Sequence, residues 1–188
     1  MMPTKNVSCK ICFIGEGGVG KTSLIGRYVY DVFDDKYLTT IGTKITRKEL
    51  ILNYPKSNVR IKMDTMIWDI MGQKAFRGLL REAYFHGAKG IIGVCNLTDK
   101  ESLAALDDWI ESLNQVVGKI PMVLLANKND LKDEILLTED EVEAMAKSLS
   151  AQFFYTSAKT GENVTKAFLT IGREMVIKQL DLPFSLES

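Results

Sequence analysis

Short apolar runs alternate with longer amphipathic stretches along the chain, which predicts strands and helices in turn. Strand-sized apolar runs lie at residues 10–14, 90–95, 120–126 and 152–155. Helical periodicity predicts helices at residues 21–30, 75–85, 99–117, 138–149 and 163–180. In the last of these, five apolar residues recur at helical spacing and should form one buried stripe: Val164, Ala167, Phe168, Ile171 and Met175.

Two long extended segments, residues 44–53 and 59–70, interrupt this alternation. Pro55 and Asn58 between them favour a turn, so the two segments are expected to form an antiparallel hairpin. Elsewhere strands alternate with helices, which predicts βαβ units and a sheet covered on both faces. We therefore expect an α/β protein with a mostly parallel sheet and one antiparallel edge strand.

Capping and helix-ending residues mark three helix boundaries. Asp99 or Ser102 can cap the helix that runs to residue 117, and Gly118 is placed to end it. Thr138 and Glu141 have the spacing of a capping box, which would open the following helix.

The composition fits one globular domain. The chain has 188 residues, of which 46% are hydrophobic and 26% charged, and this excludes a disordered chain. Lys plus Arg and Asp plus Glu are 24 each, so bulk charge gives no reason to expect nucleic acid or an anionic membrane as partner. We expect a flexible tail at residues 1–7, one domain at 8–180 and a short tail at 181–188.

The sequence has no segment that predicts membrane insertion or export. No run approaches the roughly 20 apolar residues of a membrane span, and the N-terminus lacks the apolar region of a signal peptide. We therefore expect a cytoplasmic protein.

The three cysteines are expected to be buried thiols. Cys9 and Cys12 form a C-x-x-C in a predicted strand, where their side chains would point to opposite faces, and Cys95 lies in another apolar run. His86 is the only histidine, which leaves little for a histidine-based catalytic site.

A glycine-rich loop directly follows the first strand and precedes the first helix. Residues 15–22 match G-x-x-x-x-G-K-[ST], the phosphate-binding motif, in its required strand–loop–helix context. In such a loop the backbone N–H groups bind phosphate, Lys21 reaches the β- and γ-phosphates, and the Thr22 hydroxyl binds Mg²⁺. The expected nucleotide-binding residues here are Gly15, Gly17, Gly18, Val19, Gly20, Lys21, Thr22 and Ser23.

The same loop also matches G-x-G-x-x-G, the pattern of dinucleotide-binding folds. That alternative needs an acidic residue at the end of a second strand. Asp34 and Asp35 have the distance but lie in a polar stretch, and Lys21 and Thr22 would have no role. We therefore favour the phosphate loop.

Two polar segments at strand ends predict a guanine pocket. The Asp130 carboxylate can accept hydrogen bonds from guanine N1–H and the 2-amino group, which adenine lacks. The Ala158 N–H can bind guanine O6, while Ser157 and Lys159 brace the loop. The residues assigned to this pocket are Asn127, Lys128, Asp130, Ser157, Ala158 and Lys159.

The end of the hairpin carries the remaining candidate chemistry. Asp69 suits the carboxylate that holds Mg²⁺, directly or through water, behind a phosphate loop. Gly72 can bring its N–H to the γ-phosphate, and Gln73 can orient an attacking water. With Lys21 these two are the expected catalytic residues.

Together these segments resemble the Ras superfamily of small GTPases over nearly the whole chain, with a Rab-like pattern around Ile41 and Trp68. The matching segments, in the family's order, are GEGGVGKT at 15–22, YLTTIG at 37–42, WDIMGQ at 68–73, NKND at 127–130 and TSAK at 156–159. The resemblance implies a P-loop NTPase fold, a Ras-like G domain with a six-stranded sheet and five helices, and a GTP/GDP switch that uses Mg²⁺. The pattern is also similar to Ras-like GTPases of archaea.

The resemblance implies further residue roles. Thr40 would bind Mg²⁺ and the γ-phosphate only in the GTP state, Tyr37 would close over the phosphates, and Phe33 would pack against the guanosine. Gly17 would be the loop position where a side chain crowds the catalytic glutamine. The implied metal ligands are Thr22, Thr40 and Asp69.

The resemblance also implies partners, although the sequence departs from the family pattern at two places. It implies protein effectors, an exchange factor and a GTPase-activating protein, a monomeric chain, and roles in signalling and vesicle trafficking. Ile70 and Met71 stand where the family usually has Thr-Ala, which puts a bulky side chain beside the γ-phosphate sensor. Residues 181–188 contain no cysteine, so we expect no lipid anchor on this chain.

Two other functions stay open from the residues. A nucleotide-loaded binding module with negligible turnover would act through an apolar patch of Ile41, Trp68, Phe76 and Tyr84. An ATPase of the same fold is the other, and Asp130 argues against it.

Overall fold

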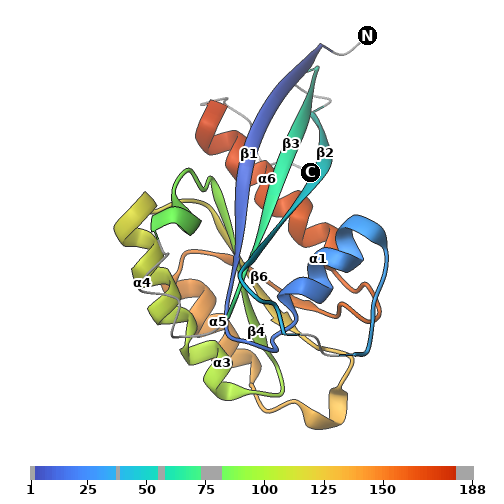
Figure 1. Cartoon of the computed structure of the whole chain (residues 1–188), viewed down its shortest axis with the longest axis vertical. Helices are drawn as coiled ribbons and strands as arrows, with labels where there is room; N and C mark the ends of the chain where they lie inside the picture. Colours follow the sequence, from blue (N-terminus) through green and yellow to red (C-terminus); the bar gives the residue numbers. More distant parts are fainter. Residues whose placement is uncertain (1–2, 37–38, 55–57, 73–81, 181–188) are drawn as a thin grey trace.

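A computed structural model describes residues 3–36, 39–54, 58–72 and 82–180, with side chains up to Lys178 (Figure 1). Tyr37, Gln73, Phe76 and most of the predicted helix at 75–85 lie outside these ranges. The described end of that helix, residues 82–85, is helical.

The chain forms one α/β domain, and its elements follow the predicted alternation. The strands are β1 (Thr4–Ile14), β2 (Thr43–Tyr54), β3 (Val59–Ile70), β4 (Gly90–Asn96), β5 (Met122–Asn127) and β6 (Gln152–Thr156). The helices are α1 (Lys21–Tyr30), α3 (Lys100–Ala104), α4 (Leu106–Val117), α5 (Glu139–Ser148) and α6 (Val164–Leu180), with a short 3-10 helix over Lys132–Glu134.

All six strands join one sheet in the order β2-β3-β1-β4-β5-β6. The β2–β3 pair is antiparallel and lies at one edge, as the hairpin predicted, and every other neighbouring pair is parallel. With five α-helices in the described residues, this confirms the predicted fold class. Parallel strands bring their carboxyl ends to one edge of the sheet, where α/β proteins bind ligands.

Helices cover both faces of the sheet (Figure 1). Leu24 of α1 and Phe168 of α6 pack in the core on one face, and Trp109 of α4 and Val142 of α5 pack in the core on the other. The predicted stripe of α6 is buried throughout, at no more than 2% exposure for any of its five residues.

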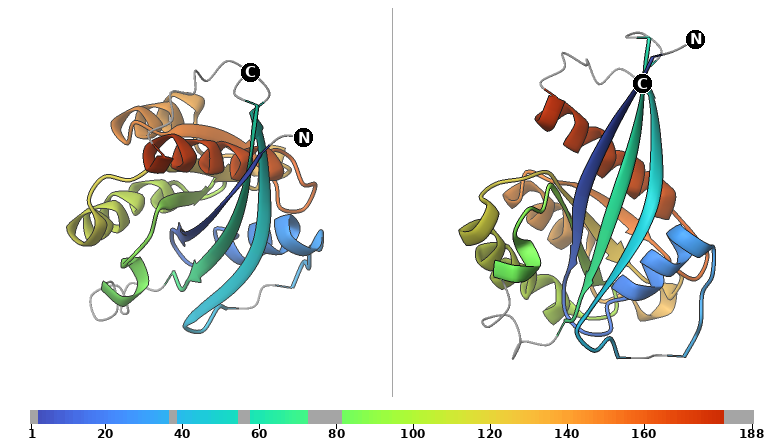
Figure 2. Two further views of the ribbon diagram at one scale, coloured as in Figure 1. Left: turned by 90° about the horizontal axis from the view of Figure 1, so that it is seen from above. Right: turned by 45° about the horizontal axis from the view of Figure 1, so that its top comes forward.

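β1, β2 and β3 extend together well beyond the other strands, with α6 alongside (Figure 2). β1 begins at Thr4, which pairs with Arg60, so residues 4–7 belong to the strand and not to the tail that we expected at 1–7. The sequence concealed this part because residues 4–8 are mostly polar and exposed, while the long β3 supplies their backbone partners.

The predicted helix at 99–117 is divided at Ala105 into α3 and α4. Asp99 caps α3 by accepting a hydrogen bond from the Glu101 N–H at 3.0 Å, and Gly118 ends α4 with φ 67°. The capping box of Thr138 and Glu141 is present at α5. No helix in the described part of the chain is long and apolar enough to cross a membrane.

The cysteines are buried and free. Cys9 lies in the core beside α1 and α6, whereas Cys12 lies in the core on the opposite face, as their spacing predicted. Burial raises the pKa of Cys12 and of Cys95 to about 12, so both stay protonated thiols.

Candidate functional site

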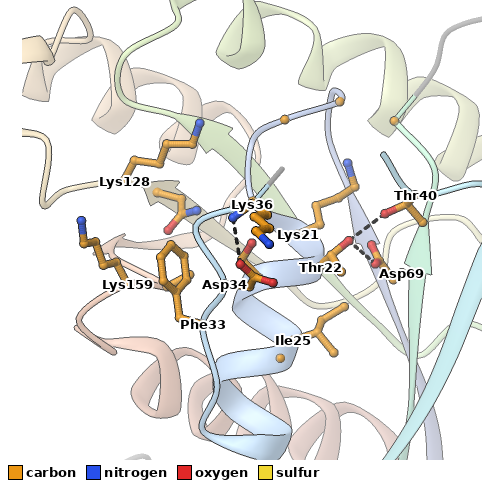
Figure 3. Close-up of a pocket in the computed structure, with 18 of the residues that line it drawn as sticks. Lys21, Thr22, Ile25, Phe33, Asp34, Lys36, Thr40, Asp69, Lys128 and Lys159 are labelled. Atoms are coloured by element: carbon orange, nitrogen blue, oxygen red, sulfur yellow. Dashed lines mark hydrogen bonds between the residues drawn. The ribbon is translucent and has the colours of Figure 1, made fainter. Parts of the chain in front are cut away.

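A cavity of about 650 Å³ opens at the carboxyl edge of the sheet. Its wall combines six segments: the loop and first turn at 17–26, residues of 30–36 with 39–40, Lys44 and Thr46 of β2, the end of β3 at 69–72, the loop after β5 at 127–131, and Ala158 with Lys159. Figure 3 shows Lys21, Thr22, Thr40 and Asp69 at one end and Phe33, Lys128 and Lys159 at the other.

The glycine-rich loop is shaped by contacts that exclude side chains. Gly15 has φ 137°, and a Cβ there would lie 2.3 Å from the Val94 carbonyl oxygen. Gly20 has φ 101°, and its Cβ would lie 2.3 Å from the Asn127 side-chain nitrogen. Both positions therefore require glycine, and the loop wraps closely around the space where α1 begins.

Lys21 is buried under this loop, with 6% of its surface exposed. Its Nζ donates hydrogen bonds to the carbonyl oxygens of Gly15 and Glu16, both at 2.7 Å. Burial lowers the pKa of Lys21 to about 8, and the nearby Asp69 carboxylate partly offsets this effect. A buried ammonium without an adjacent ion pair is an energetic cost that a bound anion would relieve.

Three oxygen-bearing side chains converge at the start of α1 (Figure 3). The Thr22 hydroxyl donates to Asp69 Oδ2 at 2.5 Å and lies 2.8 Å from the Thr40 hydroxyl. The other Asp69 oxygen is buried without a hydrogen-bond partner, and burial raises the pKa of this carboxyl while Thr22 and Lys21 oppose the shift. Two hydroxyls and a carboxylate are hard oxygen donors, so these residues fit Mg²⁺.

Gly72 lies directly against the phosphate loop. A Cβ on Gly72 would lie 2.3 Å from the Gly17 nitrogen, so only glycine fits between β3 and this loop. Met71, beside it, lines the cavity and is 7% exposed. The bulky side chain that departs from the family pattern therefore sits next to the position assigned to the γ-phosphate sensor.

Hydrogen bonds join the two base-pocket segments to each other and to the phosphate loop. Asn127 donates to the Val19 carbonyl at 2.9 Å and accepts from the Thr156 hydroxyl at 3.2 Å. The Ser157 hydroxyl donates to the Asp130 carboxylate at 2.6 Å, which is the bracing role predicted for Ser157. Asp130 lines the cavity wall, and Ser157 occupies only one of its two carboxylate oxygens.

The structure places most of the predicted binding residues in the cavity wall. These are Gly17, Gly18, Gly20, Lys21, Thr22, Ser23, Phe33, Thr40, Asp69, Gly72, Asn127, Lys128, Asp130, Ala158 and Lys159. Gly15, Val19 and Ser157 lie behind the wall, and the Val19 side chain packs in the core. Tyr37 and Gln73 lie outside the described residues, so their roles stay predictions.

Two side chains to which the sequence motifs assign no role hold the base-pocket loops. Arg27 of α1 donates to the carbonyl oxygens of Ala158 and Lys159, at 2.8 and 2.7 Å. Asn129 donates to the Glu162 carboxylate at 2.9 Å. Arg27 lies outside the motifs, and Asn129 occupies the position of NKND that has no assigned role; neither contact could be predicted, because the partners lie 131 and 33 residues away in the sequence.

The predicted apolar patch is present only in part. Ile41 is 90% exposed, but the Trp68 ring lies under the Lys10 ammonium, which is 3.5 Å from the ring centre. Tyr84 is partly buried, and Phe76 is outside the described residues.

Comparison with known proteins decides the family. The family model of the Ras family matches residues 10–177, which is nearly the entire described domain. This chain belongs to the Ras family. The six-stranded sheet and the cavity at its carboxyl edge agree with that membership.

Three relatives illustrate the similarity within the Ras family. The chain is 34% identical to the Ras-related protein SEC4 of Saccharomyces cerevisiae, over 87% of this chain and 73% of that protein. It is 35% identical to the Ras-related protein Rab-13 of Rattus norvegicus, over 90% and 80% of the two chains. It is 32% identical to the Ras-related protein Rab-21 of Bos taurus, over 92% and 75%. The chain is therefore a Rab-like small GTPase of the Ras family.

Proposed function

We propose that this protein binds GTP and GDP with Mg²⁺ in the cavity described above, hydrolyses GTP slowly, and changes its surface with the bound nucleotide. The observation that carries the proposal is the Thr22–Thr40–Asp69 cluster beside buried Lys21, at the opposite end of one cavity from Asp130. One end offers groups that suit phosphates and a metal, and the other offers a carboxylate that suits guanine.

The base end supports guanine over adenine. The Asp130 carboxylate accepts hydrogen bonds and has none to donate, so it pairs with N1–H and the 2-amino group of guanine and leaves adenine N1 unmatched. Phe33 offers an apolar ring at the wall, and Lys128 and Lys159 offer long stems on the same side.

At the phosphate end, Lys21 and the loop N–H groups bind the β- and γ-phosphates, and Thr22, Thr40 and Asp69 hold Mg²⁺. When bound, the metal neutralises charge on the phosphate oxygens. Phosphate beside Lys21 restores a partner to the buried ammonium and so favours its protonated form. The ammonium of Lys21 should therefore bind GTP, with its additional phosphate charge, more tightly than GDP.

For hydrolysis we assign Gln73 to orient the attacking water and Gly72 to donate its N–H to the γ-phosphate. The absence of a side chain at Gly72 lets the end of β3 lie directly against the phosphate loop at Gly17. Thr40 and Gly72 would be held only while the γ-phosphate is present, so its loss would release both segments.

The second candidate is a GTP-loaded binding module with negligible hydrolysis. The observation that favours it is Ile41, which is 90% exposed beside Thr40 and available to a partner. Release of phosphate from preloaded GTP by the purified protein separates the two functions, because the binding module would release none.

Partners and setting are proposed from the relatives. As for a Rab-like protein, we propose effectors that bind the GTP state, an exchange factor, a GTPase-activating protein, and a role in vesicle trafficking for a monomeric chain.

The direct test of the proposal is to identify the nucleotide that co-purifies with the protein. After denaturation, chromatography should release GDP or GTP at close to one equivalent. An adenine nucleotide at that ratio would contradict the proposed function.

A further inference from the structure

Arg27 lies at the junction of three segments that surround the base end of the cavity. Its Nε donates to the Ala158 carbonyl at 2.8 Å, and one terminal nitrogen donates to the Lys159 carbonyl at 2.7 Å. The other terminal nitrogen donates to the Asp31 carboxylate at 2.8 Å, at the end of α1. The Arg27 side chain is 21% exposed; its hydrogen bond to Ala158 is partly buried, whereas those to Lys159 and Asp31 are exposed.

Two different contacts hold the peptide groups on either side of Ala158, one from the Gly161 N–H and one from Arg27. The peptide that contains the Ala158 N–H is held at its other end, where the Gly161 N–H donates to the Ser157 carbonyl at 2.8 Å. The next peptide is held by Arg27 through the Ala158 carbonyl. The orientation of the Ala158 N–H is therefore set by one backbone contact and one side chain.

We infer that Arg27 is a positioning residue that aims the Ala158 N–H at the base of the bound nucleotide and slows nucleotide release. The inference rests on the proposed function, in which that N–H binds guanine O6. Arg27 itself does not line the cavity wall in the structure; it acts through the loop behind the wall.

The position of Arg27 on α1 explains why this brace is effective. The same helix begins with Lys21 and Thr22, so Arg27 connects the base loop rigidly to the helix that holds the phosphates. Its planar guanidinium reaches two successive carbonyl oxygens at once, which a lysine ammonium on a flexible stem cannot reproduce.

The ion pair with Asp31 is the smaller part of this arrangement. The Asp31 side chain is 89% exposed, and exposed ion pairs contribute little. The two hydrogen bonds to the loop carbonyls carry the effect.

The test compares Arg27→Met and Arg27→Lys with wild type in the full chain loaded with fluorescent GDP. Arg47→Met is the matched control, because Arg47 pairs with Asp64 on the exposed face of the β2–β3 hairpin and contacts no nucleotide loop. Two quantities are measured: the rate of GDP release, and the preference for GDP over 6-thio-GDP in competition. The analogue differs only at position 6, where sulfur is a weak hydrogen-bond acceptor.

We expect Arg27→Met to release GDP about tenfold faster and to lose most of the wild-type preference for GDP over 6-thio-GDP. Arg27→Lys should fall between the two, and Arg47→Met should match wild type. If Arg27→Met does not fold, the Arg27→Lys result decides the question alone.

A changed release rate with an unchanged preference would overturn the inference, since a purely structural role weakens both nucleotides equally. Unchanged values for both quantities would overturn it as well. Failure of the proposed function would give a different result, because wild-type protein would then show no preference for GDP over ADP.

Discussion

The two ends of the cavity are built in different ways. The phosphate end is built around the loop at residues 15–23, which is contiguous in the sequence and depends on glycines that side chains cannot replace, and Thr40, Asp69 and Gly72 join it from other segments. The base end is assembled from loops after β5 and β6, and its shape depends on side-chain hydrogen bonds from Asn127, Ser157 and Arg27. A backbone loop fixes one end, and a side-chain network fixes the other.

This difference predicts which kind of substitution disrupts each end of the cavity. At the phosphate end a change of backbone conformation should be disruptive, and most of the side chains there are proposed to contact the ligand themselves. At the base end, substitution of a side chain that touches no ligand can still move a group that does. The following predictions test this contrast, from the largest expected effect to the smallest.

Asp130→Asn should have the largest effect, because it exchanges an acceptor for a donor at the edge that reads the base. We expect GDP affinity to fall by about a hundredfold or more and affinity for xanthosine diphosphate to rise, since the amide can donate to the O2 of xanthine. Competition against fluorescent GDP measures both.

The matched control for that variant is Asp133→Asn, on the exposed surface of the 3-10 helix nearby. It should bind GDP as wild type does. Unchanged GDP affinity in Asp130→Asn would remove Asp130 from the base pocket.

Thr22→Asn should weaken GTP more than GDP. The variant loses the hydroxyl that lies between Asp69 and Thr40, and the metal it helps to hold matters most when both the β- and γ-phosphates are present. We expect GTP affinity to fall by about thirtyfold in Mg²⁺. Chelation of Mg²⁺ with EDTA serves as the control, since it should abolish the difference between variant and wild type; a difference that survives EDTA would mean that Thr22 acts without the metal.

The two ends of the cavity also differ in how well they could be predicted from the sequence. The phosphate loop was predictable because its ligands are consecutive and the strand–loop–helix context is local. Arg27 was not, because its acceptors are backbone carbonyls 131 residues away, and backbone carbonyls have no sequence signature. The start of β1 was not predictable either. Thr4 and its polar neighbours join this strand through backbone pairing with β3 and bury almost no apolar surface, so no hydrophobic pattern marks them.

Gln73→Leu should slow hydrolysis and leave nucleotide affinity nearly intact, because it removes only the amide assigned to the water. Residues 31–40 contain no arginine, and Lys36 lacks the bidentate geometry of a guanidinium. We therefore expect wild-type turnover well below one per minute, on the order of 10⁻⁴ s⁻¹ as for Ras-type enzymes alone, and about tenfold less in the variant. Single-turnover hydrolysis of preloaded GTP is the measurement, and equal rates would show that the water is placed by another group, with Met71 the first to examine.

The last prediction concerns the stability of the nucleotide-free protein, through the buried Lys21 ammonium. Lys21 has a pKa of about 8 in the fold against 10.5 in an unfolded chain, so between these values the unfolded state binds more protons. The free energy of unfolding of nucleotide-free protein should therefore rise with pH across that window, relative to Lys21→Met, by about 1 kcal/mol per pH unit. Below pH 8 both states are protonated, and the cost of burying the charge is fully present.

Urea unfolding of the two nucleotide-free proteins between pH 7.5 and 10 measures this difference, and subtraction of the variant removes the titration of other groups. A difference that does not change with pH would mean that Lys21 stays charged in the folded loop.

The central claim is that one cavity reads guanine at one end and holds phosphate with Mg²⁺ at the other. Displacement of fluorescent GDP by GDP and by ADP, each in Mg²⁺ and in EDTA, tests both ends at once. The account predicts displacement by GDP at near-stoichiometric concentration, no displacement by ADP even at about a thousandfold excess, and faster release of GDP in EDTA. Displacement by ADP at concentrations similar to those of GDP, or a GDP release rate that is the same in EDTA as in Mg²⁺, would contradict this claim.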